Sequence, residues 1–175
     1  MNHSVWLRPE PGARAKIQAS INRFASERNM QVFKAHMTLI GDLAGALQPT
    51  IDACNSLAPH IKPFQATVAS VDCSDDFFKA VYLRLEVELS RQTLAQYIPE
   101  TLVTDDRVFR HPHISIAYGA SDAGVREQIT GFLEQALLGY SFQVDELAIV
   151  RSAVSIPIDE WEILYKMKLG ATLPG

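Results

Sequence analysis

The fold is decided by two stretches of sequence, Ala35-His36-Met37-Thr38-Leu39-Ile40-Gly41 and His113-Ile114-Ser115-Ile116-Ala117-Tyr118-Gly119. Each is largely apolar, alternates in character and ends on a glycine, which is typical of a short β-strand. Residues two apart share one face of a strand, so each stretch places a histidine and a hydroxyl side by side. The pairs are His36 with Thr38 and His113 with Ser115.

The segments around these strands occur in the same order in both halves of the chain: helix, histidine strand, helix, strand, strand. Each half ends in two expected strands, at 64–71 and 78–87 in the first half and at 142–150 and 161–169 in the second. The apolar positions of 81–87 align with those of 163–169. We therefore predict one two-lobed domain over residues 1–175, built from approximate repeats 11–87 and 90–169.

Composition restricts the class of protein. The chain has 175 residues, of which 47% are hydrophobic and 21% are charged, as in an ordinary globular domain. No apolar run approaches the roughly 18 residues that a membrane span needs, and the first residues lack the pattern of a secretory signal. Cys54 and Cys73 are too few for a disulfide framework. We expect a cytoplasmic protein that is a monomer and has no membrane partner.

The charge balance of 20 acidic against 16 basic residues gives a net charge of −4. A long nucleic acid is bound through many lysine and arginine contacts, so such a partner is not expected. A small nucleotide needs only a local pocket and is compatible with this charge.

Two imidazoles and two hydroxyls in one cleft would suit the opening of a cyclic phosphodiester. One neutral imidazole takes a proton from water, and a protonated one gives a proton to the leaving sugar oxygen. The hydroxyls donate hydrogen bonds to the non-bridging oxygens. This chemistry requires neither a metal nor another cofactor. The alternative is that both histidines are half-buried strand residues bonded to nearby backbone.

The two motifs, His36-Met37-Thr38-Leu39 and His113-Ile114-Ser115-Ile116, resemble the paired signatures of the two-histidine phosphoesterase superfamily. Within it, the chain is most similar to the small cyclic phosphodiesterases that act on 2′,3′-cyclic nucleotides and on ADP-ribose 1″,2″-cyclic phosphate. The segments 5–9 and 77–83 and the tyrosine after the second motif add to the resemblance.

The resemblance implies a bilobal, duplicated α+β fold, in which two antiparallel β-sheets line a central cleft and the helices lie outside. It implies that His36 and His113 are the catalytic acid–base pair and that Thr38 and Ser115 bind the phosphate. The product would keep its phosphate on the 2′ oxygen of a nucleoside, or as a 1″-phosphate of ADP-ribose. Relatives include RNA 2′,5′-ligases, RNA-end phosphodiesterases and a non-catalytic nucleotide-binding module, which remain alternatives.

Aromatic residues near the motifs are candidates for binding substrate. Phe78 and Tyr82 share one face of the expected strand 78–87, where a base could stack. Tyr118 follows the second motif and resembles a substrate-contacting residue of the family. Strict alternation from His113 places Tyr118 on the core face, so its access to a cleft requires a bulge at the end of the strand.

A metal site is a further alternative. His111 and His113 lie two apart on a strand and could chelate a metal, with Asp105 or Asp106 as additional ligands. This hypothesis leaves the first motif, His36-x-Thr38, unexplained. The sequence contains no glycine-rich dinucleotide loop, phosphate-binding loop or serine nucleophile elbow.

Overall fold

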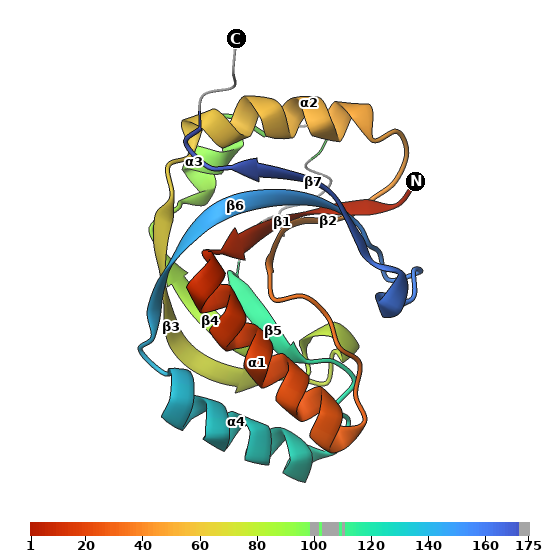
Figure 1. The fold of residues 1–175 in the computed structure, drawn as a ribbon, viewed down its shortest axis with the longest axis vertical. Helices are drawn as coiled ribbons and strands as arrows, with labels where there is room; N and C mark the ends of the chain where they lie inside the picture. Colours follow the sequence, from red (N-terminus) through yellow and green to blue (C-terminus); the bar gives the residue numbers. More distant parts are fainter. Residues whose placement is uncertain (99–101, 103–108, 110, 172–175) are drawn as a thin grey trace.

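The protein is described by a computed structural model that covers residues 1–98, 102, 109 and 111–171. In this part of the chain, the strands form a single curled sheet and the helices lie against it (Figure 1). The strands are β1 (His3–Pro9), β2 (Met37–Leu43), β3 (Phe64–Cys73), β4 (Val81–Val87), β5 (His113–Ala117), β6 (Ser141–Arg151) and β7 (Glu162–Lys168). The helices are α1 (Pro11–Arg28), α2 (Gln48–Leu57), α3 (Arg91–Ala95) and α4 (Ala123–Leu137).

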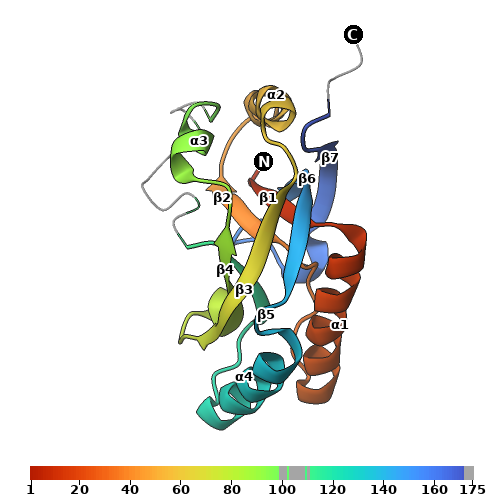
Figure 2. The same cartoon turned by 90° about the vertical axis from the view of Figure 1, so that its left-hand side faces the viewer.

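The predicted α+β fold with antiparallel strands is confirmed, and the predicted two sheets are joined into one. The strand order is β2-β1-β6-β3-β4-β5, and β7 also pairs with β6. The connection is made by β6, whose first residues pair with β3 while the rest pair with β1 and β7. Because β6 has 11 residues, it is long enough to pair with β3 in the lobe of β3, β4 and β5 and with β1 and β7 in the lobe of β1, β2 and β7. Figure 2 shows β3 and β6 side by side where the lobes meet.

The helices divide between the two ends of the sheet. Helix α4 packs against β3 and β4, and α1 contacts β5 and β1, whereas α2 contacts β6 at the opposite end (Figure 1). Buried apolar side chains from both ends form one continuous core cluster. Among the described residues, no helix is both long enough and apolar enough to cross a membrane.

Helix α1 shows how local sequence sets an element beside the site. The Glu10 carboxylate accepts hydrogen bonds from the backbone N–H groups of Gly12 and Ala13, which caps the first turn. Pro11 occupies the first turn, where its missing N–H costs nothing. The helix ends at Asn29, whose φ of 51° is left-handed.

Two strand pairs have equivalent registers. In β1–β2, Trp6 lies opposite Thr38 and Leu7 opposite Met37. In β4–β5, Tyr82 lies opposite Ser115 and Leu83 opposite Ile114. The first strands of the two pairs have similar sequences, Val5-Trp6-Leu7-Arg8 and Val81-Tyr82-Leu83-Arg84.

The spatial counterpart of β4 is therefore β1, whereas the sequence pattern aligned β4 with β7. Strand β7 is an outer strand beside β6 and does not pair with a histidine strand among the described residues. The order of elements after β1 does recur, from α1 to β4 and again from α3 to β7. The boundaries of the two repeats remain a prediction.

Candidate active site

The residues of both motifs line one pocket of about 390 Å³. His36 and Thr38 reach it from the start of β2, and His113 and Ser115 from β5. These strands lie at opposite ends of the strand order, so the curl of the sheet brings them together. The pocket thus holds two imidazoles and two hydroxyls that are distant in the sequence.

Each imidazole is held by the same backbone contact. The Nδ1–H of His36 donates to the carbonyl oxygen of Lys34 at 2.6 Å, and the Nδ1–H of His113 donates to that of His111 at 2.8 Å. A carbonyl oxygen can only accept, so these bonds fix the tautomer. In the neutral ring, Nε2 is then an unprotonated acceptor available to the pocket in both residues.

The electrostatics keep both imidazoles neutral in the free protein. Burial lowers the pKa of His36 to about 4, against the opposing effect of the hydrogen bond to Lys34. Arg8 lowers this pKa further, as does His113 when it is protonated. Burial also lowers the pKa of His113 below its usual range, with Lys79 lowering and Asp76 raising it. The effect of His113 on His36 indicates that the two rings are close enough to interact.

The depressed pKa of His36 predicts a loss of stability in acid. The unfolded chain has the ordinary pKa of 6.5 and the folded chain about 4, so below pH 6.5 the unfolded state binds more protons. Each pH unit of that window is worth about 1.4 kcal/mol per proton, so this residue should destabilise the fold by ~3 kcal/mol at pH 4. Urea denaturation of wild type and His36→Asn between pH 4 and 7.5 measures this. An equally steep decline in both proteins would contradict it.

The two hydroxyls differ in their surroundings. Ser115 is buried, and its Oγ donates to the carbonyl oxygen of Phe78 at 2.8 Å. Thr38 is exposed, on the strand opposite Trp6. The hydroxyls therefore approach the pocket from both lobes.

Of the three aromatic residues predicted to bind substrate, Phe78 and Tyr118 line the pocket and Tyr82 is not among the described lining residues. Phe78 lines the pocket, but it lies in a 3-10 turn (Phe77–Lys79) before β4 and not within the strand, as we predicted. Tyr82 is buried and is not among the described residues that line the pocket; its ring lies edge-on to His113, with centroids 5.4 Å apart. Tyr82 therefore packs against the ring of His113.

Tyr118 does line the pocket, and the bulge that this required is present. Val81 pairs with Ala117 and Tyr82 with Ser115, so one residue of β5 is extra at this point. The Tyr118 ring stacks on Phe33 with centroids 3.6 Å apart, and burial raises the pKa of its phenol, which therefore stays protonated.

The next residue, Gly119, holds the Phe77–Lys79 turn in place. Its N–H donates to the carbonyl oxygen of Phe77 at 2.8 Å, and its φ is +66°. A Cβ here would lie 2.7 Å from the Phe77 ring, closer than such atoms approach. The glycine that ends the second motif thus allows the turn carrying Phe78 to pack against the end of β5.

Sequence reasoning missed two aromatic residues of the pocket, Trp6 and Trp161. The Trp6 ring stacks on the imidazole of His36, with centroids 3.6 Å apart and planes at 11°. Trp161 comes from the segment before β7 and meets Trp6 edge-on at 5.9 Å. The similarity of Val5-Trp6-Leu7-Arg8 to Val81-Tyr82-Leu83-Arg84 was a signal that could have found Trp6.

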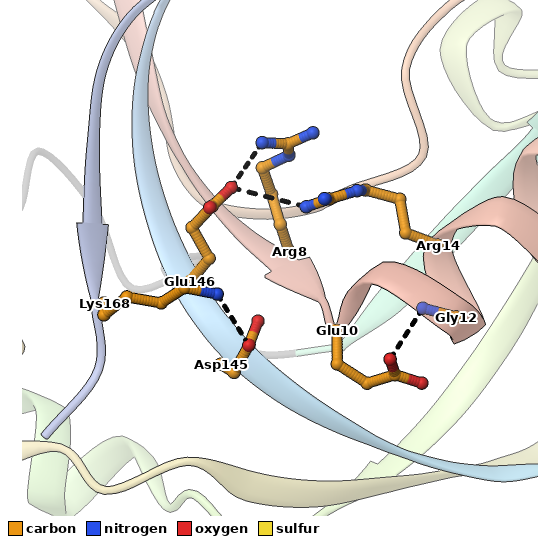
Figure 3. Close-up of polar contacts among 7 residues, drawn as sticks. All are labelled: Arg8, Glu10, Gly12, Arg14, Asp145, Glu146 and Lys168. Carbon is orange, nitrogen blue, oxygen red and sulfur yellow. Dashed lines mark hydrogen bonds and ion pairs between the residues drawn. The ribbon is translucent and has the colours of Figure 1, made fainter.

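A buried cluster of charged side chains lies close to His36. Arg8 follows Trp6 on the same face of β1 and pairs with Glu146, directly opposite on β6. Glu146 also contacts Arg14 of α1 at 3.4 Å (Figure 3). Arg8 is 7% and Glu146 8% exposed, so this pair is shielded from solvent. It places one arginine close enough to His36 to affect its pKa.

The metal hypothesis is only partly open to test. Its candidate ligands Asp105 and Asp106 lie outside the described residues. Within residues 1–98, 102, 109 and 111–171, no group of three or more His, Cys, Asp or Glu side chains is placed to hold a metal ion. His111 is exposed, and its carbonyl oxygen is the group that accepts from His113.

A joined pair of lobes, with a histidine and a hydroxyl from each facing one pocket, defines a two-histidine phosphoesterase. The chain belongs to the 2′-5′ RNA ligase superfamily, whose family model matches residues 9–155. This confirms the resemblance stated from the two motifs. A comparison with curated protein sequences found no match.

Solved structures share this fold over nearly the whole chain. TT0787 of Thermus thermophilus is 17% identical, covers 97% of this chain and 98% of its own, and superposes with a TM-score of 0.60. E. coli LigT complexed with 3′-AMP is 18% identical, with coverages of 96% and 97% and a TM-score of 0.53. LigT in apo form is 15% identical, with coverages of 96% and 96% and a TM-score of 0.57. At these identities, the likeness is one of fold.

Proposed function

We propose that the protein is a metal-independent cyclic phosphodiesterase that hydrolyses small nucleotide-like 2′,3′- or 1″,2″-cyclic phosphates. The observation that carries this proposal is that His36 and His113 line one pocket. The backbone bonds of their Nδ1 atoms also fit the alternative of two strand histidines, but that alternative does not predict a shared pocket. A pair of such rings can take and give a proton on opposite sides of one phosphorus atom.

In the proposed hydrolysis, each histidine carries out one proton transfer. The Nε2 of one neutral histidine removes a proton from water as the water oxygen attacks phosphorus. The bond from phosphorus to one ring ester oxygen breaks, and the imidazolium of the other histidine gives that oxygen its proton. Thr38 donates a hydrogen bond to a non-bridging oxygen. The Ser115 hydroxyl has one proton, so it turns from the carbonyl oxygen of Phe78 to donate to another non-bridging oxygen, where negative charge is held in the transition state.

Substrate binding supplies the protonated partner. Both histidines have a lowered pKa in the free protein, which suits the base but not the acid. The negative charge of a bound phosphodiester raises the pKa of an adjacent imidazole, because an opposite charge favours the ionised form. Bound substrate therefore favours protonation of one of the two histidines.

The size of the pocket favours a small substrate. A volume of about 390 Å³ lies in the range of roughly 300–1,000 Å³ that is usual for small-molecule sites. Together with a net charge of −4, this supports a nucleotide over a long RNA.

The experiment is an assay of cyclic phosphates in excess chelator. We expect turnover of a 2′,3′-cyclic nucleotide, with a bell-shaped pH dependence of kcat/KM from one acid and one base. Loss of activity on chelation would support the metal hypothesis. Activity confined to RNA oligomers would support the ligase branch, and tight binding of nucleotide without turnover would support a binding module.

A further inference from the structure

Four aromatic side chains line one side of the pocket: Trp6, Phe78, Tyr118 and Trp161. We call them the aromatic wall. Phe78 and Trp161 lie at its centre, with ring centroids 6.1 Å apart and planes at 21°. Tyr118 meets Phe78 edge-on at 5.3 Å and Trp161 at 6.2 Å. The rings come from separate segments of the chain, so only the folded molecule assembles them.

We propose that Phe78 and Trp161 bind the base of the nucleotide whose own ribose carries the cyclic phosphate. This inference deepens the proposed function, on which it rests. It identifies nucleoside 2′,3′-cyclic phosphates as the preferred substrates over ADP-ribose 1″,2″-cyclic phosphate, and it makes Trp161 a specificity-determining residue.

Phe78 lies next to one of the proposed phosphate-binding residues, Ser115. The backbone carbonyl oxygen of Phe78 accepts the hydrogen bond from Ser115 Oγ in the free protein, which places residue 78 next to this hydroxyl, and both side chains line the same pocket. A group that stacks on Phe78 therefore lies near a phosphate bound by Ser115. In a 2′,3′-cyclic nucleotide, one ribose separates base from phosphorus. In the ADP-ribose compound, a second ribose and a diphosphate intervene.

The two rings are suited to stacking. Both are only partly buried and nearly parallel, and a flat base needs about 3.5–4.0 Å from each ring that it covers. A base between them would thus part the rings by about 1–2 Å, or it would stack on one exposed face. Trp161 is anchored because its Nε1–H donates to the carbonyl oxygen of Ile156 at 3.0 Å.

The charged residues that line the pocket also favour a nucleoside 2′,3′-cyclic phosphate over a substrate with a diphosphate. Among the described residues that line it, Lys79 is the one lysine or arginine, beside the acidic residues Asp42 and Asp76. A diphosphate carries additional negative charges, which proteins balance with several cationic groups. The described part of the lining therefore suits a single phosphodiester and a stacked base.

The test compares Trp161→Leu with Trp161→Phe. Both variants lose the hydrogen bond to Ile156, so they differ in the aromatic ring alone. For 2′,3′-cyclic AMP, we expect Trp161→Leu to raise KM by about 5- to 100-fold with kcat changed less than about threefold, and Trp161→Phe to recover most of this. For a base-free ribose cyclic phosphate, neither variant should change KM. The matched control is Tyr165→Leu, because Tyr165 is exposed on β7 and is not a lining residue.

Equal losses of Trp161→Leu on the base-free substrate would overturn the proposal, because the residue would then be structural. So would a wild-type kcat/KM for ADP-ribose 1″,2″-cyclic phosphate that matches or exceeds that for 2′,3′-cyclic AMP.

A binding readout separates this inference from the proposed function. The chain has two tryptophans, Trp6 and Trp161, so a Trp6→Phe variant reports on Trp161 alone. Adenosine 2′-monophosphate should quench this fluorescence, and ribose phosphate should not. Quenching without turnover of any cyclic phosphate would support the base site and contradict the proposed hydrolase activity. Turnover without quenching would support the hydrolase activity and contradict the base site.

Discussion

Replacement of His36 or of His113 by alanine is expected to lower kcat/KM for a 2′,3′-cyclic nucleotide by about 10²- to 10⁴-fold. Each imidazole is the partner in one proton transfer, and a positioned acid or base contributes a factor of this size. The two histidines act as a unit, so one cannot complete the reaction when the other is absent. The double variant should therefore be only slightly less active than the less active of the two single variants. Initial rates in excess chelator measure the three proteins side by side.

The control for this prediction is His60→Ala. His60 is exposed, and its ring stacks on Tyr97 with centroids 4.6 Å apart, outside the pocket lining. The variant also removes an imidazole but should keep wild-type activity. Retention of more than a tenth of the activity by either His36→Ala or His113→Ala would contradict acid–base roles for that residue. Circular dichroism and thermal melts show whether each variant remains folded.

Glu146→Ala is expected to lower the free energy of unfolding by about 3–5 kcal/mol. The change leaves Arg8 buried without its carboxylate, and an uncompensated charge in a protein interior is costly. Arg14 loses the same partner but is more exposed, so it contributes less. Urea denaturation at pH 7.5 measures the effect, with the denaturant slope as a check on two-state behaviour.

Two further variants distinguish the charge from the packing. Lys168→Ala removes the exposed pair of Lys168 with Asp145, drawn in Figure 3 beside the buried cluster, and should change stability by about 0–1 kcal/mol. In the double variant Arg8→Met/Glu146→Leu, both buried charges are gone and much of the loss should be recovered. A Glu146→Ala effect as small as that of Lys168→Ala would show that the cluster is hydrated.

The chemistry of the site was predictable from local pattern, because strand alternation has a period of two. His36 with Thr38 and His113 with Ser115 had to share faces once their segments formed strands. The same alternation placed Tyr118 on the core face, and only its resemblance to a substrate-contacting residue of the family called for the bulge that brings it to the pocket. Hydrogen bonds from these histidines to nearby backbone were expected only under the alternative of half-buried strand residues, and the pattern did not identify the accepting residues, Lys34 and His111.

The pairing of strands was less predictable. Residues of β4 and β7 share an apolar alternation, and on that basis they were aligned, although β1 is the strand that pairs with the first motif as β4 pairs with the second. Alternation specifies which face of a strand is buried and carries no information on its neighbours. The short sequence shared by β1 and β4 held that information, in a segment outside the predicted repeats.

The amino-acid sequence by itself determined the α+β class, the two histidine strands and the side chains that each presents. It did so because those properties follow from the period of a strand and from the chemistry of the residues. Only the tertiary structure decided that β6 joins both lobes into one sheet and that Trp161 reaches the pocket. These features depend on packing between segments far apart in the chain, where the burial of apolar surface and the length of β6 select one arrangement.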